Sequence, residues 1–387
     1  MPDKRVVFPL YMLDAPRYGK RFWSMVDQLI TSMASYFSAG NTVPVIVGTD
    51  SDDVKAIVGQ VARHFNYPVD VTVNGNSEIM GTAGRFAEAI CRDRMDECRF
   101  DVVTSKIFAM LNVGSEYDRL VVDIDTLWFG KVPWEQFGNG SSKGMAMFAP
   151  PQWKHPLSIT VGQMLYYRSR FLAKTSLEEY CRKLVSVDER WKVVPLISSL
   201  PWPNSGVIYM TSEFTRERYA KEIDNPAMPL LSVEDETPLV SLLLAGGGYE
   251  TRIGMNVPVA FTDITMEEDP LHPAGVICAH FHRSPKPDTF NVTYGGVLRH
   301  PDLHDGRSLD FLKDSIASGQ YGSMSGILWC YVWRYYFSIA SRIYRNGDEV
   351  PVYGQDFWEG ILECYRKSRQ IWLDGIEGQR TMLEFKL

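Results

Sequence analysis

The first 125 residues alternate short apolar runs with longer segments whose apolar residues recur at helical spacing. The short runs, rich in valine, predict strands at residues 6–10, 44–48, 69–73 and 120–123. The longer segments predict helices at residues 22–36, from the Asp50-Ser51-Asp52 cap to about residue 64, at 82–98 and at 102–111. This alternation predicts a parallel sheet covered by helices, in which ligands bind beyond the carboxyl ends of the strands.

The second half of the chain is less regular. A glycine-rich loop at residues 138–144 ends the first half at about residue 137, and strands are expected near residues 145–148 and 206–210. We expect the α/β domain to span residues 1–300, with halves of about 1–137 and 145–300. Residues 301–387 are predicted to be a mainly helical, aromatic-rich C-terminal region.

The glycine-rich phosphate fingerprints are missing from the sequence. No G-x-G-x-x-G follows the first predicted strand, and no G-x-x-x-x-G-K-[ST] occurs. Dinucleotide-binding and P-loop functions therefore lose their main support, and bound phosphates would need another partner.

Paired carboxylates follow the fourth predicted strand. Asp123 and Asp125 come directly after a run of apolar residues. Side chains alternate in an extended chain, so both carboxylates would point to the same side and could reach one ion. Such hard oxygen ligands suit Mn²⁺ or Mg²⁺, which would neutralise a diphosphate. Two solvated acids that cap a turn are the structural alternative.

Composition and charge narrow the class of protein. Hydrophobic residues make up 45% and charged residues 22% of the chain, as in soluble globular proteins. The formal net charge of −7 argues against nucleic acid as a partner. Six scattered cysteines without a C-x-x-C pair, and an N-terminus that passes directly into a strand, favour a cytoplasmic protein whose membrane contact would be peripheral.

The carboxylate segment also resembles a known family. Residues 117–132 (YDRLVVDIDTLWFGKV) are similar to the D-x-D segment of retaining GT-A glycosyltransferases of family 8. The resemblance implies a GT-A, Rossmann-like nucleotide-sugar transferase fold and a metal ion on Asp123 and Asp125. It also implies donor contacts from Ile124 and from Lys106, which stands where the family has an arginine.

Two later segments extend the resemblance in family order. Residues 203–207 (PNSGV) are similar to the family's asparagine-small-glycine segment, which implies roles for Asn204 and Gly206 at the donor sugar. A plain turn would explain the same residues. Residues 279–287 (AHFHRSPKP) are similar to the family's H-x-x-G-x-x-K-P-W, with Arg283 in place of the glycine and Asp288 in place of the tryptophan. This resemblance implies that His280 is the third metal ligand and that Lys286 holds the diphosphate; His282 is an alternative ligand.

Candidates for the remaining roles are less specific. Asp235 and Glu236 lie in an acidic cluster similar to the family's aspartate-glutamine-aspartate segment, and they suit sugar contact and helix capping about equally. With Asn204 they are the candidate catalytic residues, and retention of configuration is slightly favoured. Leu10 and Tyr11, at the end of the first strand, are the candidates for binding the nucleoside, with uridine expected from the resemblance.

The sequence thus predicts a metal-dependent glycosyltransferase with a UDP-sugar donor and a glycan, protein or lipid-linked acceptor. Residues 150–203, rich in aromatic and basic residues, are expected to help bind the acceptor. A sugar nucleotidyltransferase and a non-catalytic sugar- or nucleotide-binding protein of the same fold are the rivals. Residues 326–347 suit a core helix better than an interfacial membrane helix by about two to one.

Overall fold

The computed structural model describes eleven parts of the chain, from residue 3 to residue 280. They are residues 3–13, 19–91, 97–128, 130–137, 145–148, 160–199, 204–214, 216–231, 252–253, 261–263 and 278–280.

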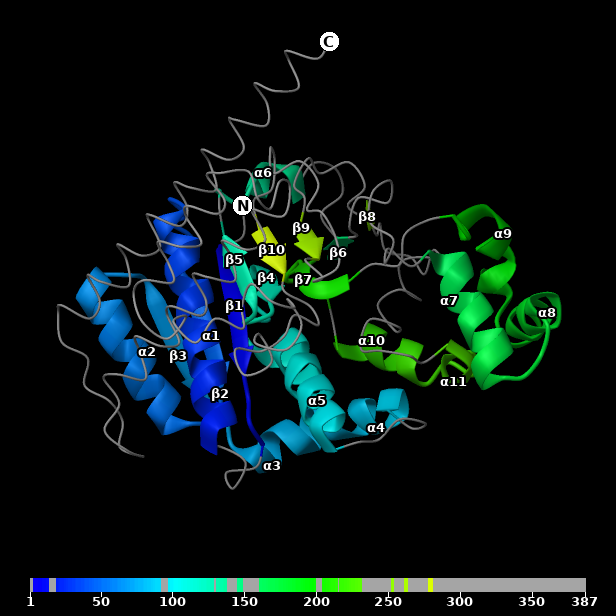
Figure 1. Cartoon of the computed structure of the whole chain (residues 1–387), viewed down its shortest axis with the longest axis horizontal. Coiled ribbons are helices and arrows are strands. Elements are labelled where there is room, and N and C mark those ends of the chain that lie inside the picture. Colours follow the sequence, from blue (N-terminus) through cyan, green and yellow to red (C-terminus); the bar gives the residue numbers. More distant parts are fainter. Residues whose placement is uncertain are drawn as a thin grey trace, which may run out of the picture.

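The strands form two sheets (Figure 1). The seven-stranded sheet has the order β3-β2-β1-β4-β7-β6-β8, comprising β1 (Lys4–Leu10), β2 (Val45–Thr49), β3 (Val69–Val73), β4 (Asp118–Val122), β6 (Met145–Phe148), β7 (Asn204–Met210) and β8 (Arg252–Ile253). Its first four strands are parallel, whereas β7 runs antiparallel to both β4 and β6. The three-stranded sheet comprises β5 (Thr126–Trp128), β10 (Cys278–His280) and β9 (Phe261–Asp263), in that order.

Helices connect the strands. Those of the N-terminal half are α1 (Gly19–Ser38), α2 (Asp52–Phe65), α3 (Asn76–Ile79), the π-helix η2 (Met80–Gly84), α4 (Arg85–Cys91), α5 (Glu97–Asn112) and α6 (Trp134–Phe137). Those that follow are α7 (Val161–Tyr167), the π-helix η3 (Arg168–Leu172), α8 (Leu177–Val187), the 3₁₀-helix η4 (Glu189–Val193), α9 (Val194–Ile197), α10 (Arg216–Ile223) and α11 (Met228–Leu231).

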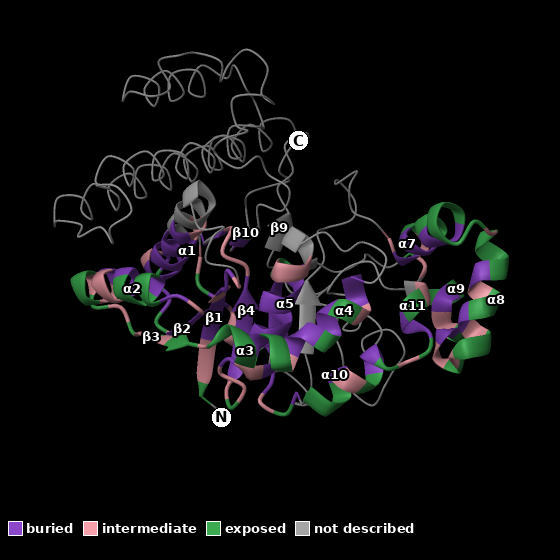
Figure 2. Cartoon of the chain, turned by 90° about the horizontal axis from the view of Figure 1, so that it is seen from below, coloured by how far each residue is buried: buried purple, intermediate pink, exposed green. Residues whose placement is uncertain are grey.

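Helices bury both faces of β1, β2 and β4. Alternate residues of β1 face opposite sides, so Val6 and Phe8 pack in one apolar cluster with α1 and α2, whereas Val7 packs in another with α4 and α5. These three strands accordingly lie in the buried interior of the molecule (Figure 2), whereas β3 at the edge of the sheet is partly exposed. Two-sided burial explains why the buried parts of β1, β2 and β4 are continuously apolar in sequence.

The predicted α/β architecture is confirmed. The expected strands at 6–10, 44–48, 69–73, 120–123, 145–148 and 206–210 match β1, β2, β3, β4, β6 and β7 within two residues at each end. The helix predicted at 82–98 is confirmed over residues 82–91, where the π-helix η2 leads into α4, and residues 97 and 98 belong to α5; the helical stretch begins earlier than expected, with α3 at Asn76. The expected helices after residue 231 lie outside the described residues, and the division at residues 137, 145 and 300 stays a prediction.

Helices α7, α8 and α9, with η3 and η4, form a lobe beside the sheet (Figure 1). Thr160 and Gln163 form a capping box that starts α7, and Val161 and Leu165 of that helix join the same apolar cluster as α4 and α5. None of the described helices is both long and apolar enough to cross a membrane.

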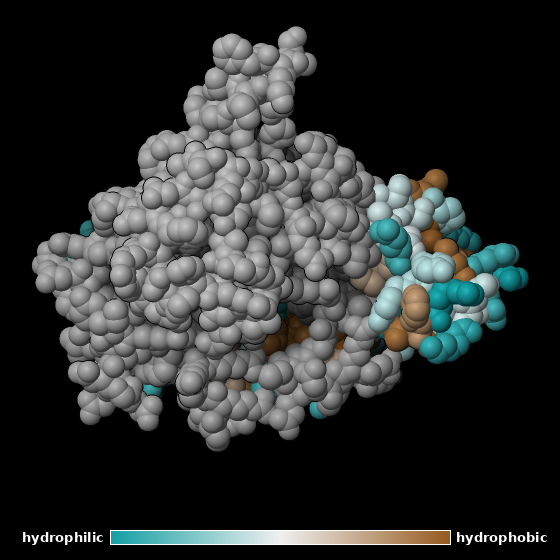
Figure 3. All heavy atoms as spheres, in the orientation of Figure 1, coloured by the Kyte–Doolittle hydropathy of each residue, from teal (hydrophilic) through white to brown (hydrophobic). Residues whose placement is uncertain are grey.

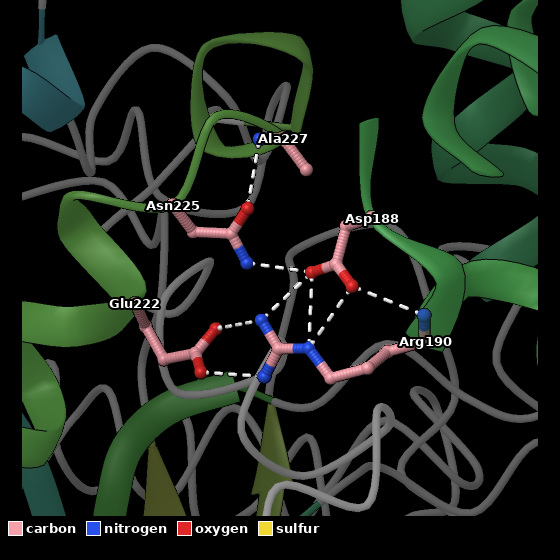
Figure 4. A network of polar contacts seen from close by, with 5 residues as sticks. All are labelled: Asp188, Arg190, Glu222, Asn225 and Ala227. Atoms are coloured by element: carbon pink, nitrogen blue, oxygen red, sulfur yellow. Dashed lines mark hydrogen bonds and ion pairs between the residues drawn. The ribbon is translucent and has the colours of Figure 1, made fainter. Parts of the chain in front are cut away.

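A polar network connects this lobe to the loop between α10 and α11 (Figure 4). The Arg190 guanidinium donates to both carboxylate oxygens of Glu222 and to both of Asp188. Asn225 donates to Asp188 Oδ2 over 2.6 Å and accepts from the backbone N–H of Ala227 over 2.9 Å. The network therefore joins the end of α8 to α10 and α11.

Candidate active site

The two carboxylates of the D-x-D segment lie in a turn between two strands. Asp123 directly follows β4, and Ile124 and Asp125 form the turn that leads into β5. The Thr126 hydroxyl donates to the backbone oxygen of Asp123 over 3.0 Å and closes the turn. The expectation of an extended chain with alternating side chains was therefore wrong, because the backbone forms a turn at Ile124 and Asp125. Ile124 is half-buried and packs against the α1 side of the core.

Lys106, which lies on α5, connects Asp123 to β7. Its amine, at the end of a buried side chain on α5, donates to Asp123 Oδ2 over 2.8 Å and to Ser205 Oγ over 2.7 Å. The Asp123 side chain remains 26% exposed. Residues that lie 99 positions apart in sequence thus meet at the carboxyl end of β4.

The asparagine-small-glycine segment is a strand and not a turn. Asn204, Ser205 and Gly206 are the first residues of β7, which pairs with β4 in antiparallel fashion. The backbone oxygen of Gly206 accepts the N–H of Asp123 over 2.8 Å. This strand therefore fixes the backbone at Asp123. Asn204 pairs with Phe148 of β6 at a register shift, and its side chain lies outside the described residues.

Strand β10 brings the predicted third ligand next to the D-x-D turn. It pairs with β5 so that His280 lies opposite Thr126, one residue after Asp125. Burial strongly raises the pKa of the Cys278 thiol; a hydrogen bond with Thr126 opposes the rise, and the nearby Asp125 carboxylate adds to it. His280 is placed here by backbone register alone. Among the described residues, no three His, Cys, Asp or Glu side chains form a metal-binding group.

The end of β1 is rigidly held. Leu10 is buried in the core, and the buried Tyr11 ring packs edge-on against Phe108, with its hydroxyl donating to Asn74 Oδ1 over 3.0 Å. Burial raises the pKa of Tyr11, and the charge of Asp50 adds to the rise. The side chains of Leu10 and Tyr11 are thus buried on opposite faces of the sheet, in the two core clusters.

Asp50 has a different role from the helix-capping role that the sequence predicts. It was predicted to help cap α2, but the cap is Ser51, whose hydroxyl accepts the Val54 N–H. The Asp50 carboxylate instead accepts the N–H groups of Met12 at 2.9 and 3.0 Å and of Leu13 at 2.6 Å. Parallel pairing of Leu10 with Thr49 is the signal that places Asp50 beside the end of β1.

The remaining predicted residues lie outside the described parts of the chain. They are Asp235, Glu236, His282 and Lys286. The structure therefore brings together Lys106, Asp123 and the Ser205–Gly206 segment, with Asp125 and the backbone of His280 beside them. The carboxylates of Asp123 and Asp125, which follow β4, are oxygen ligands of the kind that a divalent cation takes.

Comparisons with known proteins give only structural matches. No protein-family model matches the chain, and no curated protein sequence matches it. Mouse xyloside xylosyltransferase 1 in its apo form is similar over 67% of this chain and 87% of its own, with 9% identity and a TM-score of 0.41. Galactosyltransferase LgtC with donor and acceptor sugar analogs is similar over 73% and 88%, with 12% identity and a TM-score of 0.38.

Core-mannan synthase A from Aspergillus fumigatus, in a form with Mn and GDP, is similar over 65% of this chain and 73% of its own, with 12% identity and a TM-score of 0.37.

Proposed function

We propose that this chain is a metal-dependent glycosyltransferase of the GT-A type, which transfers a sugar from a nucleotide-sugar donor to a glycan, protein or lipid-linked acceptor. The observation that supports it best is the meeting of Lys106, Asp123 and Ser205 at the carboxyl end of β4. Three segments contact one another in space, and each of them resembles the family in sequence. A UDP-sugar is the expected donor.

The donor set suits a hard divalent cation. Asp123 and Asp125 offer carboxylate oxygens from one turn. Strand β10 pairs with β5, and this pairing places the His280 backbone opposite Thr126, the residue after Asp125. We propose that Asp123, Asp125 and His280 hold Mn²⁺ or Mg²⁺. When bound, the ion would stabilise the charge that develops on the departing nucleoside diphosphate.

The chain's own residues supply the rest of the site. Lys106 holds one Asp123 oxygen in place, and the Gly206 carbonyl fixes the Asp123 backbone. Lys286 is assigned to the diphosphate, and Leu10 and Tyr11 to the nucleoside through their backbone. Asn204, Asp235 and Glu236 are the candidates for contacting the transferred sugar, with retention slightly favoured.

Thermal unfolding with a panel of nucleoside diphosphates, each with and without Mn²⁺, tests the donor site. A ligand that binds only the folded protein raises the midpoint, by about 2.7 kcal/mol of stabilisation at a concentration of 100 times its Kd. We expect one nucleotide, UDP, to raise the midpoint only when metal is present. No shift with any nucleotide would favour the non-catalytic rival.

A substitution of Asp125 tests the metal site. Asp125→Ala should abolish metal-dependent nucleotide binding and sugar transfer but leave the unfolding midpoint of the free protein almost unchanged, because Asp125 is partly exposed in a turn. Asp70→Ala, at an exposed position of β3, is the matched control and should behave like the wild type. Normal turnover in Asp125→Ala would refute the proposed role.

A further inference from the structure

The lobe of α7, α8 and α9 carries an unusual surface where α7 passes into η3. Figure 3 shows apolar side chains at the surface of this lobe among polar ones. We define the aromatic tip as the exposed large apolar and basic residues of this segment, namely Tyr166, Tyr167, Arg170, Phe171, Leu172 and Lys174.

The aromatic tip has an inverted pattern of burial. Phe171 is 58% exposed and Tyr166 49%, whereas Arg168 between them is only 4% exposed. The Arg168 guanidinium points inward and donates to the backbone oxygens of Leu230 and Pro229 over 3.1 and 3.3 Å. A charged residue thus anchors the segment to α11, and its apolar neighbours face the solvent.

The backbone geometry of η3 holds these apolar side chains at the surface. The N–H of Ala173 donates to the Arg168 oxygen over 2.8 Å, which is the wider turn of a π-helix, and such turns are frequent at functional sites. Tyr167 and Phe171 consequently lie against each other with ring centroids 5.5 Å apart. Lys174 ends the segment in the left-handed conformation, with φ of 55°. The apolar side chains are therefore held in place on a rigid turn.

The charges of the aromatic tip are all of one sign. Residues 161–177 contain three basic residues and no acidic one, and Glu178 and Glu179 follow at the start of α8, where Glu179 accepts a hydrogen bond from Thr175. Over residues 161–187 five basic residues outnumber these two acidic ones. Of the three basic residues in 161–177, Arg168 is anchored inside, while Arg170 and Lys174 are exposed among the apolar side chains. A chain with a net charge of −7 thus presents a local positive, aromatic surface.

We propose that the aromatic tip is a site that docks the protein on an anionic lipid surface. Aromatic rings and leucine enter the boundary between headgroups and acyl chains, and nearby Lys and Arg attract anionic headgroups. A sugar-binding platform would need amide or carboxylate partners beside its rings. In this stretch the amide oxygen of Gln163 and the carboxylate of Glu179 already accept hydrogen bonds from Thr160 and Thr175 at the starts of α7 and α8. A stable contact with a second copy takes about 20–30 residues a side, more than this single turn offers.

Co-sedimentation of the whole chain with vesicles tests this proposal, which does not rest on the proposed function. We expect binding to vesicles of phosphatidylcholine with one quarter phosphatidylglycerol, weaker binding to phosphatidylcholine alone, and a loss of binding as salt rises. Phe171→Ser with Leu172→Ser should lower the partition coefficient at least about tenfold.

Two further variants separate charge from folding effects. Arg170→Glu with Lys174→Glu, which changes exposed charges only, should lower binding to the anionic vesicles by more than about twentyfold, since each basic residue contributes about fivefold. Val102→Ser and Lys55→Glu are matched controls at exposed positions of α5 and α2, and should bind as the wild type does.

Three outcomes would overturn the proposal. One is vesicle binding that survives both double variants, which would place lipid contact elsewhere, for example at residues 326–347. Another is an absence of binding to the anionic vesicles, whether or not the chain binds a glycan through Phe171 and Leu172 instead. The third is a dimer in solution that the same variant converts to a monomer.

Discussion

At the scale of single residues, Lys106 is the most informative position in the site. Its buried amine contacts a carboxylate from the D-x-D turn and a hydroxyl from β7, so it joins both segments to α5. The resemblance implied a contact with the donor, and the geometry adds a second task, the positioning of Asp123. A partner that orients a metal-binding carboxylate commonly affects metal affinity as strongly as some direct ligands do.

Two substitutions of Lys106 should show whether its amine positions Asp123 or whether the side chain only fills space. Lys106→Met keeps the length of the side chain but removes the donor, so we expect metal-dependent nucleotide binding to weaken about 10- to 100-fold. Lys106→Arg keeps the charge and should restore most of the affinity. Calorimetric titration with UDP and Mn²⁺ measures both variants. Equal affinities for the Met variant and the wild type would show that Lys106 only fills space.

At the scale of elements, the site depends on connections between strand ends and helices. The Asp50 carboxylate, at the end of β2, holds the backbone that leaves β1, and Asn76 adds a hydrogen bond from its side chain to the Leu13 oxygen over 2.8 Å. Leu13 has φ of 51°, a conformation that costs energy for a leucine and that these contacts stabilise. The β1 end is therefore shaped by its neighbours.

Removing the charge of Asp50 should loosen this loop. Asp50→Asn loses one acceptor oxygen and the charge, so we expect the free energy of unfolding to fall by about 1–2 kcal/mol. Hydrogen exchange at the Met12 and Leu13 amides should accelerate more than exchange at Val7, which lies inside β1. Asp53→Asn, at an exposed position of α2, is the control. Unchanged protection at both amides would contradict the assigned role.

The network around Arg190 should make the stability of the lobe depend on pH. Burial raises the pKa of Asp188, but hydrogen bonds from Arg190 and Asn225 outweigh it and hold the pKa below its usual value. A carboxylate with a depressed pKa stabilises the folded state above its unfolded pKa of about 3.9, and that stability is lost as pH falls through the lower folded value.

Arg190→Met tests this dependence. The variant leaves the carboxylates of Asp188 and Glu222, both largely buried, without their cation, so we expect a loss of about 3 kcal/mol at pH 7. The difference from the wild type should shrink between about pH 5 and pH 3, as urea unfolding at each pH would show. Arg182→Met, at an exposed position of α8 paired with Glu178, is the control and should change stability by less than about 0.5 kcal/mol. A difference that stays constant with pH would refute the coupling.

At the scale of the whole molecule, the site depends on the pairing of Thr126 with His280, which lie 154 positions apart in the sequence. Strand β10 lies between β5 and β9, and Cys278 is fully buried against the α1 side of the core. This pairing places His280 opposite Thr126. Without it, the turn with Asp123 and Asp125 would lack its proposed third ligand.

The accessibility of Cys278 reports whether β10 is docked. Because the thiol is fully buried, we expect it to alkylate at least about 100-fold more slowly in the native protein than in urea, whereas the half-buried Cys181 should be protected far less. Mass spectrometry of the peptides after a timed pulse of iodoacetamide measures each site. Equal rates for the two cysteines in the native protein would contradict the docking of β10.

Local patterns in the sequence were sufficient for the parallel half of the fold. The strands up to Val122 and the cap of α2 follow from apolar runs, helical spacing and a serine cap, because burial of both strand faces and of one helix face leaves a periodic record in the sequence. The same patterns placed the start of the helical stretch that ends at Cys91 six residues too late, and they did not indicate the π-helix η2, which packs against α5.

The sequence by itself determined the α/β class, the candidate carboxylates and the neighbouring motif residues, since residue type and spacing carry that information. Only the tertiary structure decided that the Asp123–Asp125 segment is a turn, that Asn204 begins a strand, that Lys106 contacts Asp123, and that Asp50 serves the end of β1. These contacts join residues far apart in the chain. Strand order and register determine these contacts, and neither can be predicted from the periodicity of a single segment.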